Sequence, residues 1–147
     1  MEINEDGFTL VEMVIVLGCL SLMLTIVNTV SSKMFDGYEQ KAFLNQLQKD
    51  IYYAQAFAIE NRTYVTFRFM TNQNDYTAYN YSNSHILTST QKPESIRFKA
   101  VGNIVVSFTS AGNIEVPGTI NLVDRNGKII YKLVFQLGRG RFYIAEV

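Results

Sequence analysis

The hydrophobic residues of this 147-residue chain change their spacing along the sequence, and each spacing predicts a different element. Residues 13–32 form a run of 20 residues without a charge, about the length of helix that crosses a bilayer core of ~30 Å. Over residues 33–61 apolar residues recur at steps mostly of three or four, which indicates an amphipathic helix. These residues are Phe35, Phe43, Leu47, Ile51, Ala54 and Ala58. We therefore predict one helix of about fifty residues that ends near residues 60–62.

Beyond residue 62 the period changes from 3.6 to 2, which indicates β-strands. The predicted strands are residues 64–69, 76–81, 96–100, 104–108, 119–123, 128–137 and 141–147. Asn126-Gly127 is a strong hairpin signal. Residues 82–94 are polar and are predicted to form a loop. The helix aromatics Phe43, Tyr52, Tyr53 and Phe57 are expected to face the sheet. The predicted fold class is α+β, with one long N-terminal helix packed on a C-terminal antiparallel β-sheet.

Charge and cysteine content narrow the class of protein. The formal net charge is +0 with 18% charged residues, so the overall balance does not mark a nucleic-acid binder. Cys19 is the single cysteine, which excludes an intramolecular disulfide and a cysteine-rich zinc site. We interpret Cys19 as an apolar packing residue, with an intersubunit disulfide or a lipid attachment as the alternatives.

Glu12 is the only charged side chain between Asp6 and Lys33. A carboxylate placed in hydrocarbon costs roughly 2.5–3.5 kcal/mol on insertion scales. Glu12 therefore either lies at the membrane boundary, where water solvates it, or has a partner of opposite charge. The residues alone leave both readings open.

The stretch Gly7-Phe8-Thr9-Leu10-Val11-Glu12, followed by the apolar run, resembles the class III signal of type IV pilins and pseudopilins. The resemblance implies that a prepilin peptidase cleaves after Gly7 and that Phe8, the new N-terminus, is N-methylated. It also implies that Glu12 is an assembly residue, which pairs with the new ammonium group on a neighbouring subunit. The leader is acidic where family leaders usually carry Lys or Arg, so the expected orientation depends on the motif alone.

This resemblance divides the chain into four parts. They are a leader peptide (1–7), a transmembrane and assembly helix (8–32), an amphipathic helix (33–61) and an antiparallel β-sheet domain (62–147). The chain would cross the cell membrane once with its C-terminal domain outside, and would reach the cell surface after assembly into a pilus.

The later motifs are similar to those of minor pseudopilins of the subunit-H-like group, and most similar to ComGD-type competence pseudopilins of Gram-positive bacteria. They include residues 108–112, 118–120 and 137–141. The implied function is a structural subunit of a competence machine that takes up DNA in transformation. The implied partners are other major and minor pseudopilins, the prepilin peptidase and N-methyltransferase, an assembly ATPase and a membrane platform protein. Type II secretion, type IV pilus biogenesis and a signal-anchored surface protein are the alternatives.

Catalytic chemistry has little support in the sequence. His85 is the only histidine and lies in a polar stretch without a second ligand at metal-like spacing, so we interpret it as a loop residue. Asp75, Glu115 and Asp124 lie near predicted turns, where carboxylates commonly form local hydrogen bonds. We expect no enzymatic activity, no catalytic residues, no metal and no cofactor.

Basic residues are more numerous than acidic ones in the later strands, which raises direct DNA binding as a hypothesis. The candidate DNA contacts are Arg97, Lys99, Lys128, Lys132, Arg139 and Arg141. Tyr79, Tyr81 and Tyr143 would supply stacking platforms for bases. The alternative is that these residues are solvent-facing strand positions that keep the domain soluble, because they form no dense cluster in the sequence.

Overall fold

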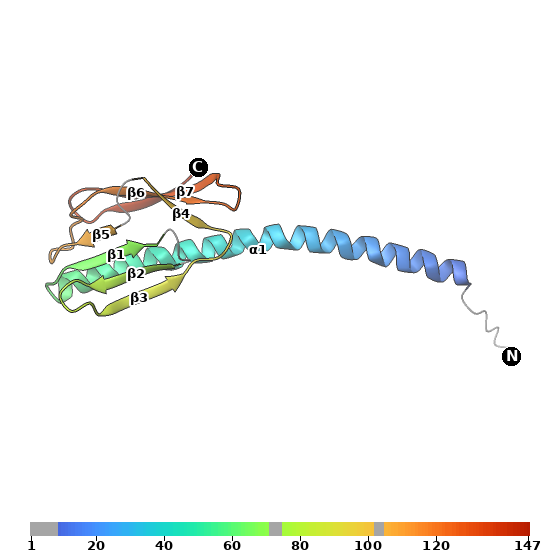
Figure 1. Ribbon diagram of the computed structural model, residues 1–147, viewed down its shortest axis with the longest axis horizontal. Helices are drawn as coiled ribbons and strands as arrows, with labels where there is room; N and C mark the ends of the chain where they lie inside the picture. The colour runs from blue at the N-terminus through green and yellow to red at the C-terminus, as the bar shows by residue number, and fades with distance from the viewer. Residues whose placement is uncertain (1–8, 71–74, 102–104) are drawn as a thin grey trace, which may run out of the picture. The chain divides into compact units, whose positions relative to one another are not determined.

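The computed structural model describes residues 9–70, 75–101 and 105–147, with only the backbone at 27–34 and 100–101 (Figure 1). The helix α1 (Leu10–Glu60) has 51 residues, so both the predicted long helix and its predicted end are confirmed. The chain divides into two compact units, Met1–Tyr38 and Glu39–Val147. The boundary expected at residue 32 stays a prediction, and residues 1–8 lie outside the described part.

Within the described residues, the strands form two four-stranded antiparallel sheets. Their bounds are β1 (Val65–Phe69), β2 (Asp75–Asn80), β3 (Ile86–Gln91), β4 (Arg97–Val101), β5 (Val105–Phe108), β6 (Gly118–Val123), β7 (Ile129–Phe135) and β8 (Phe142–Glu146). The first sheet has the order β3-β2-β1-β5 and the second has the order β4-β6-β7-β8. The predicted α+β class is confirmed, whereas the division into two sheets was not predicted.

The prediction of a loop over residues 82–94 is wrong at β3. This strand pairs with β2 from Asp75↔Gln91 to Tyr79↔Ile86, with an irregularity after Ala78. Backbone hydrogen bonds hold β3 at the sheet edge, so it needs no strongly apolar face, and its side chains are half-buried or exposed. The hairpin at Asn126-Gly127 is confirmed. Asp124 Oδ1 accepts hydrogen bonds of 2.9 Å from the backbone N–H groups of Asn126 and Lys128.

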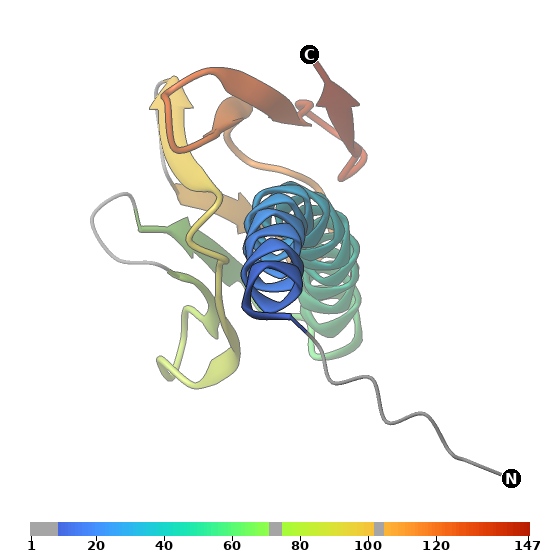
Figure 2. The same cartoon turned by 90° about the vertical axis from the view of Figure 1, so that its right-hand side faces the viewer.

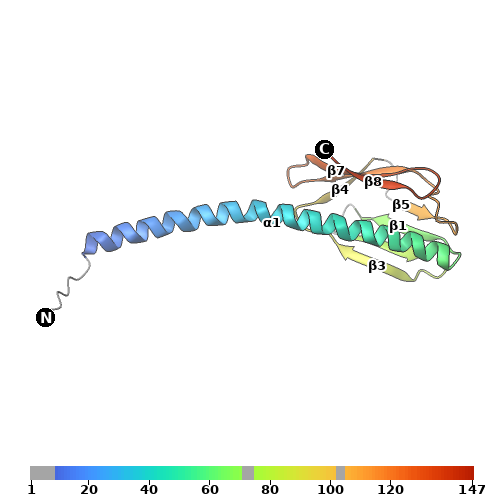
Figure 3. The same ribbon diagram turned by 180° about the vertical axis from the view of Figure 1, so that it is seen from behind.

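The core of the second unit lies between α1 and the two sheets. Figure 2 looks along α1 and shows the strands on one side of the helix; Figure 3 shows the uncovered side from behind. The buried helix residues are Phe43, Leu47, Ile51, Ala54 and Ala58. They pack against residues of both sheets, including Phe67, Phe69, Tyr76, Phe98, Ile120, Leu133 and Phe135. The predicted helical stripe is therefore confirmed over this segment.

Four aromatic residues of α1 are not in this core, and Tyr38, at 76% exposed, is the most exposed of them. Phe35 lies before the second unit and is 67% exposed, while Tyr52 and Tyr53 are 52% and 51% exposed. Both tyrosines fall beside the stripe through Ile51 and Ala54, because successive helix residues are about 100° apart. Tyr52 still touches the second sheet through Phe142, with ring centroids 4.9 Å apart. Phe43 and Phe57 face the core as expected.

A polar cluster inside this core ties α1 to the first sheet. Asp50 is buried, and its Oδ2 accepts hydrogen bonds from the Tyr76 hydroxyl at 2.6 Å and the Thr90 hydroxyl at 3.1 Å. Its Oδ1 accepts one from the Gln46 amide at 2.8 Å. A buried carboxylate is tolerated when its lone pairs are filled in this way. Burial, and then the bond to Asp50, raises the pKa of Tyr76 far above its ordinary value of 10.0.

We predict that Tyr76→Phe lowers the free energy of unfolding by about 1–3 kcal/mol near pH 7, because it leaves the buried Asp50 oxygen underbonded. The raised pKa means that folding holds the Tyr76 proton more tightly than the unfolded chain does. That part of the stability is complete below pH 10 and is lost as the pH rises further. The unfolding free energy should therefore fall less steeply above pH 10 in Tyr76→Phe than in the parent chain.

Denaturant unfolding monitored by circular dichroism across a pH series measures both effects. Tyr143→Phe is the matched control, since Tyr143 is 48% exposed, and it should change stability by no more than about 0.5 kcal/mol. Tyr131, whose pKa is also raised by burial and by Glu146, remains in both variants. Equal stability and equal alkaline slopes in Tyr76→Phe and Tyr143→Phe would contradict the buried-cluster account.

Candidate assembly site at the start of the helix

The first turn of α1 is closed by a reciprocal pair of side chains, Thr9 and Glu12. Thr9 directly precedes the helix, and its Oγ1 accepts a hydrogen bond of 3.3 Å from the Glu12 backbone N–H. In return, Glu12 Oε2 accepts bonds of 3.4 Å from both the backbone N–H and the hydroxyl of Thr9. This is a capping box, which satisfies two backbone donors that a helix start otherwise leaves open.

Our reading of the sequence missed this second use of Glu12, although the pattern Thr-x-x-Glu before an apolar run signals it. Both Thr9 contacts fall on Oε2, and Oε1 accepts no hydrogen bond from the described residues. A carboxylate has about four lone-pair positions. The capping box therefore leaves Glu12 able to accept a further cation.

The helix surface that follows Glu12 is apolar on all sides. Its large hydrophobic residues between Leu10 and Ile26 range in exposure from 49% at Val16 to 80% at Leu10. Ser21 and Thr25 turn their hydroxyls inward to the carbonyls of Leu17 and Ser21, at 2.8 and 2.9 Å. Both of these polar side chains therefore form their hydrogen bonds with the backbone of the same helix. Contiguous exposed apolar surfaces of this kind mark contacts with other proteins or with lipid.

In the described residues, no helical stretch reaches the combined length and hydropathy of a membrane span. Cys19 is exposed on this same part of α1. The predicted cleavage residues Gly7 and Phe8 lie outside the described part of the chain. Their roles stay predictions.

The six candidate DNA contacts fall in three places on or beside the second sheet. Lys99 pairs in register with Asn121, and Asn121 pairs with Lys132. Directly paired residues point to the same face, so the two lysines flank Asn121 in one row, two strand spacings or roughly 10 Å apart. Asn121 is buried, and its Oδ1 has no hydrogen-bond partner in the described part of the chain.

Of the remaining four candidates, Arg97 is two residues before Lys99 on β4 and therefore on the same face, roughly 7 Å along the strand. Arg97 donates a hydrogen bond of 2.7 Å to the Arg125 carbonyl and therefore lies at the β6–β7 turn, where Lys128 also lies. Arg139 and Arg141 are exposed in the β7–β8 turn, beside a hollow of about 270 Å³ that Gln136 and Leu137 complete. The fold thus places Arg97, Lys99 and Lys132 on one face of the second sheet, whereas Arg139 and Arg141 lie in the β7–β8 turn.

The other chemical candidates are dispersed. His85 is exposed directly before β3, where its backbone N–H donates to Asn83 Oδ1 at 3.0 Å. Across the described residues, no group of three or more His, Cys, Asp or Glu side chains is placed to hold a metal ion. Asp124 serves the β6–β7 turn, and Glu115 lies beside β5, where its backbone N–H bonds to the Ser107 carbonyl at 3.0 Å.

Comparison with known proteins gives a match to a family motif and matches to solved structures. Residues 4–28 match the prokaryotic N-terminal methylation motif. The fold is similar to that of the type IV minor pilin FimU of Pseudomonas aeruginosa, with 14% identity over 71% of this chain and 87% of that one, at a TM-score of 0.60. No curated protein matches the sequence.

A second similar structure is the minor pseudopilin EpsH from the Type 2 Secretion System of Vibrio cholerae. It has 12% identity over 74% of this chain and 97% of that one, at a TM-score of 0.60. The chain therefore has a type IV pilin-like fold, a helix packed on antiparallel sheets, as predicted. It combines this fold with an N-terminal methylation motif that contains the capping box.

Proposed function

We propose that this chain is a minor pseudopilin, a structural subunit of a type IV pilus-like machine, processed after Gly7 and methylated at Phe8. The observation that carries the proposal is Glu12, the one carboxylate in the first turn of an exposed apolar helix, inside the matched motif at residues 4–28. The pilin-like fold of the rest of the chain supports it. Chemistry would then belong to partner proteins, and this chain would be a structural part and a peptidase substrate.

Cleavage after Gly7 would create an ammonium group on Phe8, four residues or about one helical turn before Glu12. N-methylation keeps that positive charge. When subunits pack their apolar helices together, Glu12 of one chain would meet the ammonium of its neighbour. A wrong stagger leaves a buried charge unpaired, which costs about 3–5 kcal/mol. The pair would therefore select one register, and the capping box would hold the carboxylate in place beforehand.

Before assembly, we propose that residues 8–32 hold the chain in the cell membrane as a single pass, with residues 62–147 outside. The exposed apolar surface from Leu10 to Ile26 supports this placement. The proposed partners are major and minor pseudopilins, the peptidase and N-methyltransferase, an assembly ATPase and a platform protein. Assembly would exchange lipid for neighbouring helices around the same surface.

Among such machines we propose a competence pilus for DNA uptake, on the resemblance of the later motifs to ComGD-type pseudopilins. Type II secretion and type IV pilus biogenesis are the alternatives, since they use the same N-terminal signal. A second candidate role is direct DNA contact at the pilus tip. The row of Lys99 and Lys132 on the outer face of the second sheet favours it, because paired lysines neutralise phosphates.

Co-expression with an active prepilin peptidase should yield a chain that lacks residues 1–7 and has a methylated Phe8 at its N-terminus. Intact mass and N-terminal sequencing of the membrane extract measure this. Gly7→Leu should leave the chain uncut, because the bulky side chain sits next to the bond that is cleaved. An intact Met1 terminus in the presence of the active peptidase would refute the processing step.

Glu12→Gln should reduce incorporation into sheared pili at least tenfold, because glutamine keeps a capping acceptor but leaves the neighbour's ammonium unpaired. Thr9→Val is the matched control. It removes the cap, at about 1 kcal/mol, but keeps the carboxylate, and should assemble nearly as well as the parent chain. Immunoblots of sheared and membrane fractions measure the ratio. Equal losses in the two variants would assign Glu12 to helix capping alone.

If the second sheet contacts DNA, the double variant Lys99→Glu/Lys132→Glu should weaken duplex binding. The plot of log affinity against log salt should also become less steep, with its negative slope reduced in magnitude by about 1.8, as expected for two lost phosphate contacts. Fluorescence anisotropy over a salt series measures both. Lys41→Glu/Lys49→Glu on α1 changes the net charge equally and should have a smaller effect. An equal loss in this control would indicate that net charge, not the lysine row, governs binding.

A further inference from the structure

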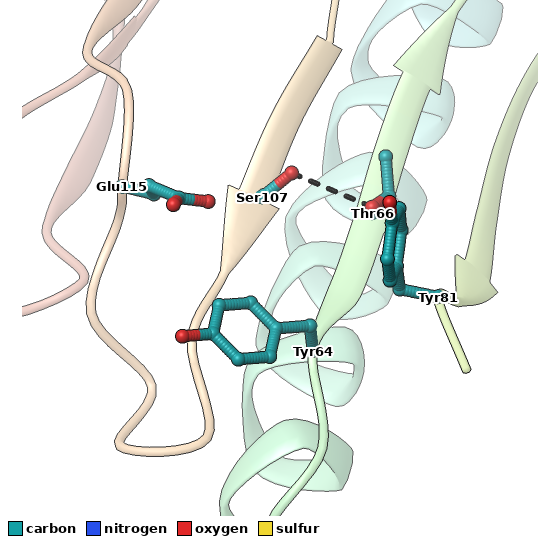
Figure 4. Close-up of a pocket in the computed structure, with 5 residues that line it drawn as sticks. All are labelled: Tyr64, Thr66, Tyr81, Ser107 and Glu115. Atoms are coloured by element: carbon teal, nitrogen blue, oxygen red, sulfur yellow. Dashed lines mark hydrogen bonds between the residues drawn. The ribbon is translucent and has the colours of Figure 1, made fainter.

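The outer face of the first sheet carries a hollow of about 330 Å³ that the proposed assembly does not use. It is lined by Tyr64, Thr66, Tyr81, Ser107 and Glu115 (Figure 4). Tyr64 and Tyr81 are 45% and 71% exposed. Figure 4 shows the Glu115 side chain directed toward Ser107, across the space beside the Tyr64 ring. A hollow of this size accommodates one small functional group.

Backbone contacts hold the walls of this hollow in place. The Tyr81 N–H donates to the Tyr64 carbonyl at 2.9 Å, which keeps the two tyrosines adjacent. Thr66 and Ser107 are register partners on β1 and β5, with their hydroxyls 3.4 Å apart. The Glu115 N–H donates to the Ser107 carbonyl at 3.0 Å, which places the carboxylate beside β5.

The segment before Glu115 is also anchored. Ile114 is buried, and its N–H donates to the Gly138 carbonyl at 3.1 Å. Gln55 on α1 donates through Nε2 to the Gly112 carbonyl at 2.8 Å. The carboxylate therefore projects from a fixed loop, and the hollow is largely preformed.

The lining is selective for positive charge. It contains two tyrosine rings, the aliphatic hydroxyls of Thr66 and Ser107, and one carboxylate, and no basic side chain. Aromatic faces carry the negative part of a quadrupole and attract cations, and the carboxylate adds a full negative charge. A phosphate or another anion would be repelled by Glu115, so the chemistry of this face is opposite to that of the lysine row on the second sheet.

The neighbouring hollow on the same face shows the contact that this one lacks. There the Arg68 guanidinium lies 5.4 Å from the centre of the Tyr79 ring and donates to its hydroxyl at 3.1 Å. In the described part of the chain, neither Tyr64 nor Tyr81 has such a cation partner, and the Glu115 carboxylate has no ion pair. The chain thus supplies a cation for one tyrosine of this face and none for the other two.

We propose that the hollow of Tyr64, Tyr81 and Glu115 is a binding site for an organic cation, an alkylammonium or guanidinium group. Such a group is presented by a lysine or arginine of a partner protein, or by a quaternary ammonium compound. The site is open, so the isolated group binds with a millimolar Kd. The inference needs only the second unit and is independent of the proposed assembly.

The test uses the full chain in detergent, with its tyrosine rings labelled with carbon-13. Butylammonium, ethylguanidinium and choline are titrated in turn, and 3,3-dimethylbutan-1-ol serves as the uncharged isostere of choline. The ring signals of Tyr64 and Tyr81, assigned with Tyr64→Phe and Tyr81→Phe, should shift saturably with at least one cation and not with the alcohol. If butylammonium or ethylguanidinium has the lowest Kd, the ligand resembles a lysine or arginine side chain. If choline has the lowest Kd, the ligand is a quaternary ammonium compound.

Four variants separate the contributions of the carboxylate and of the aromatic ring. Glu115→Gln should raise the Kd by about fivefold and remove most of its salt dependence, while Glu39→Gln, an exposed carboxylate on α1, should change neither. Tyr64→Leu should weaken binding more than Tyr64→Phe, which keeps the aromatic face. Circular dichroism confirms that each variant folds, which is expected because Glu115 and Tyr64 are exposed.

Two results would overturn the proposal. One is the absence of a saturable shift with all three cations. The other is that the uncharged alcohol, or N-acetylglucosamine titrated in the same way, binds as tightly as choline and that Glu115→Gln does not change the Kd. The second result would identify the hollow as a neutral stacking surface for sugars or apolar groups.

Discussion

Both sheets bury their apolar faces against one stripe of α1, between Phe43 and Ala58, and the rest of the second unit depends on this contact. Each large residue buried there stabilises the fold by about 1.5–3 kcal/mol relative to exposure. Ala54 and Ala58, both fully buried, let strands approach the helix closely. Apolar packing alone does not fix the position of α1 along the sheet. The hydrogen bonds of the buried Asp50 to Tyr76 on β2 and Thr90 on β3 do so.

Since the helix and core occupy the inner faces, the outer faces of the sheets are free to differ in chemistry. The second sheet presents Lys99 and Lys132 in one row, while the first presents tyrosines, hydroxyls and Glu115. Although the formal net charge is +0, the lysine row and the hollow beside Glu115 therefore carry charges of opposite sign. The proposed DNA contact and the proposed cation site are compatible on one domain for this reason.

Glu12 has two uses that do not compete. In the single chain its Oε2 completes the capping box with Thr9, and the same carboxylate retains acceptor positions for a neighbour's ammonium. An unpaired carboxylate on a bare apolar helix would be mobile and costly to bury. One that is already held at the helix start loses less conformational freedom when it forms the intersubunit pair.

Local patterns in the sequence were sufficient for the long helix, its end at Glu60, its buried stripe and most strands, because each depends on the spacing of neighbouring residues. The motif at residues 4–28 is equally local. Tertiary structure alone decided the division into two sheets, the pairing of β3 with β2, and the exposure of Tyr52 and Tyr53. It also decided which lysines share a row, and it brought Glu115 to Tyr64 from about fifty residues away. The two-residue period of a strand shows which side chains share a face, but it does not show which other strand will pair with it.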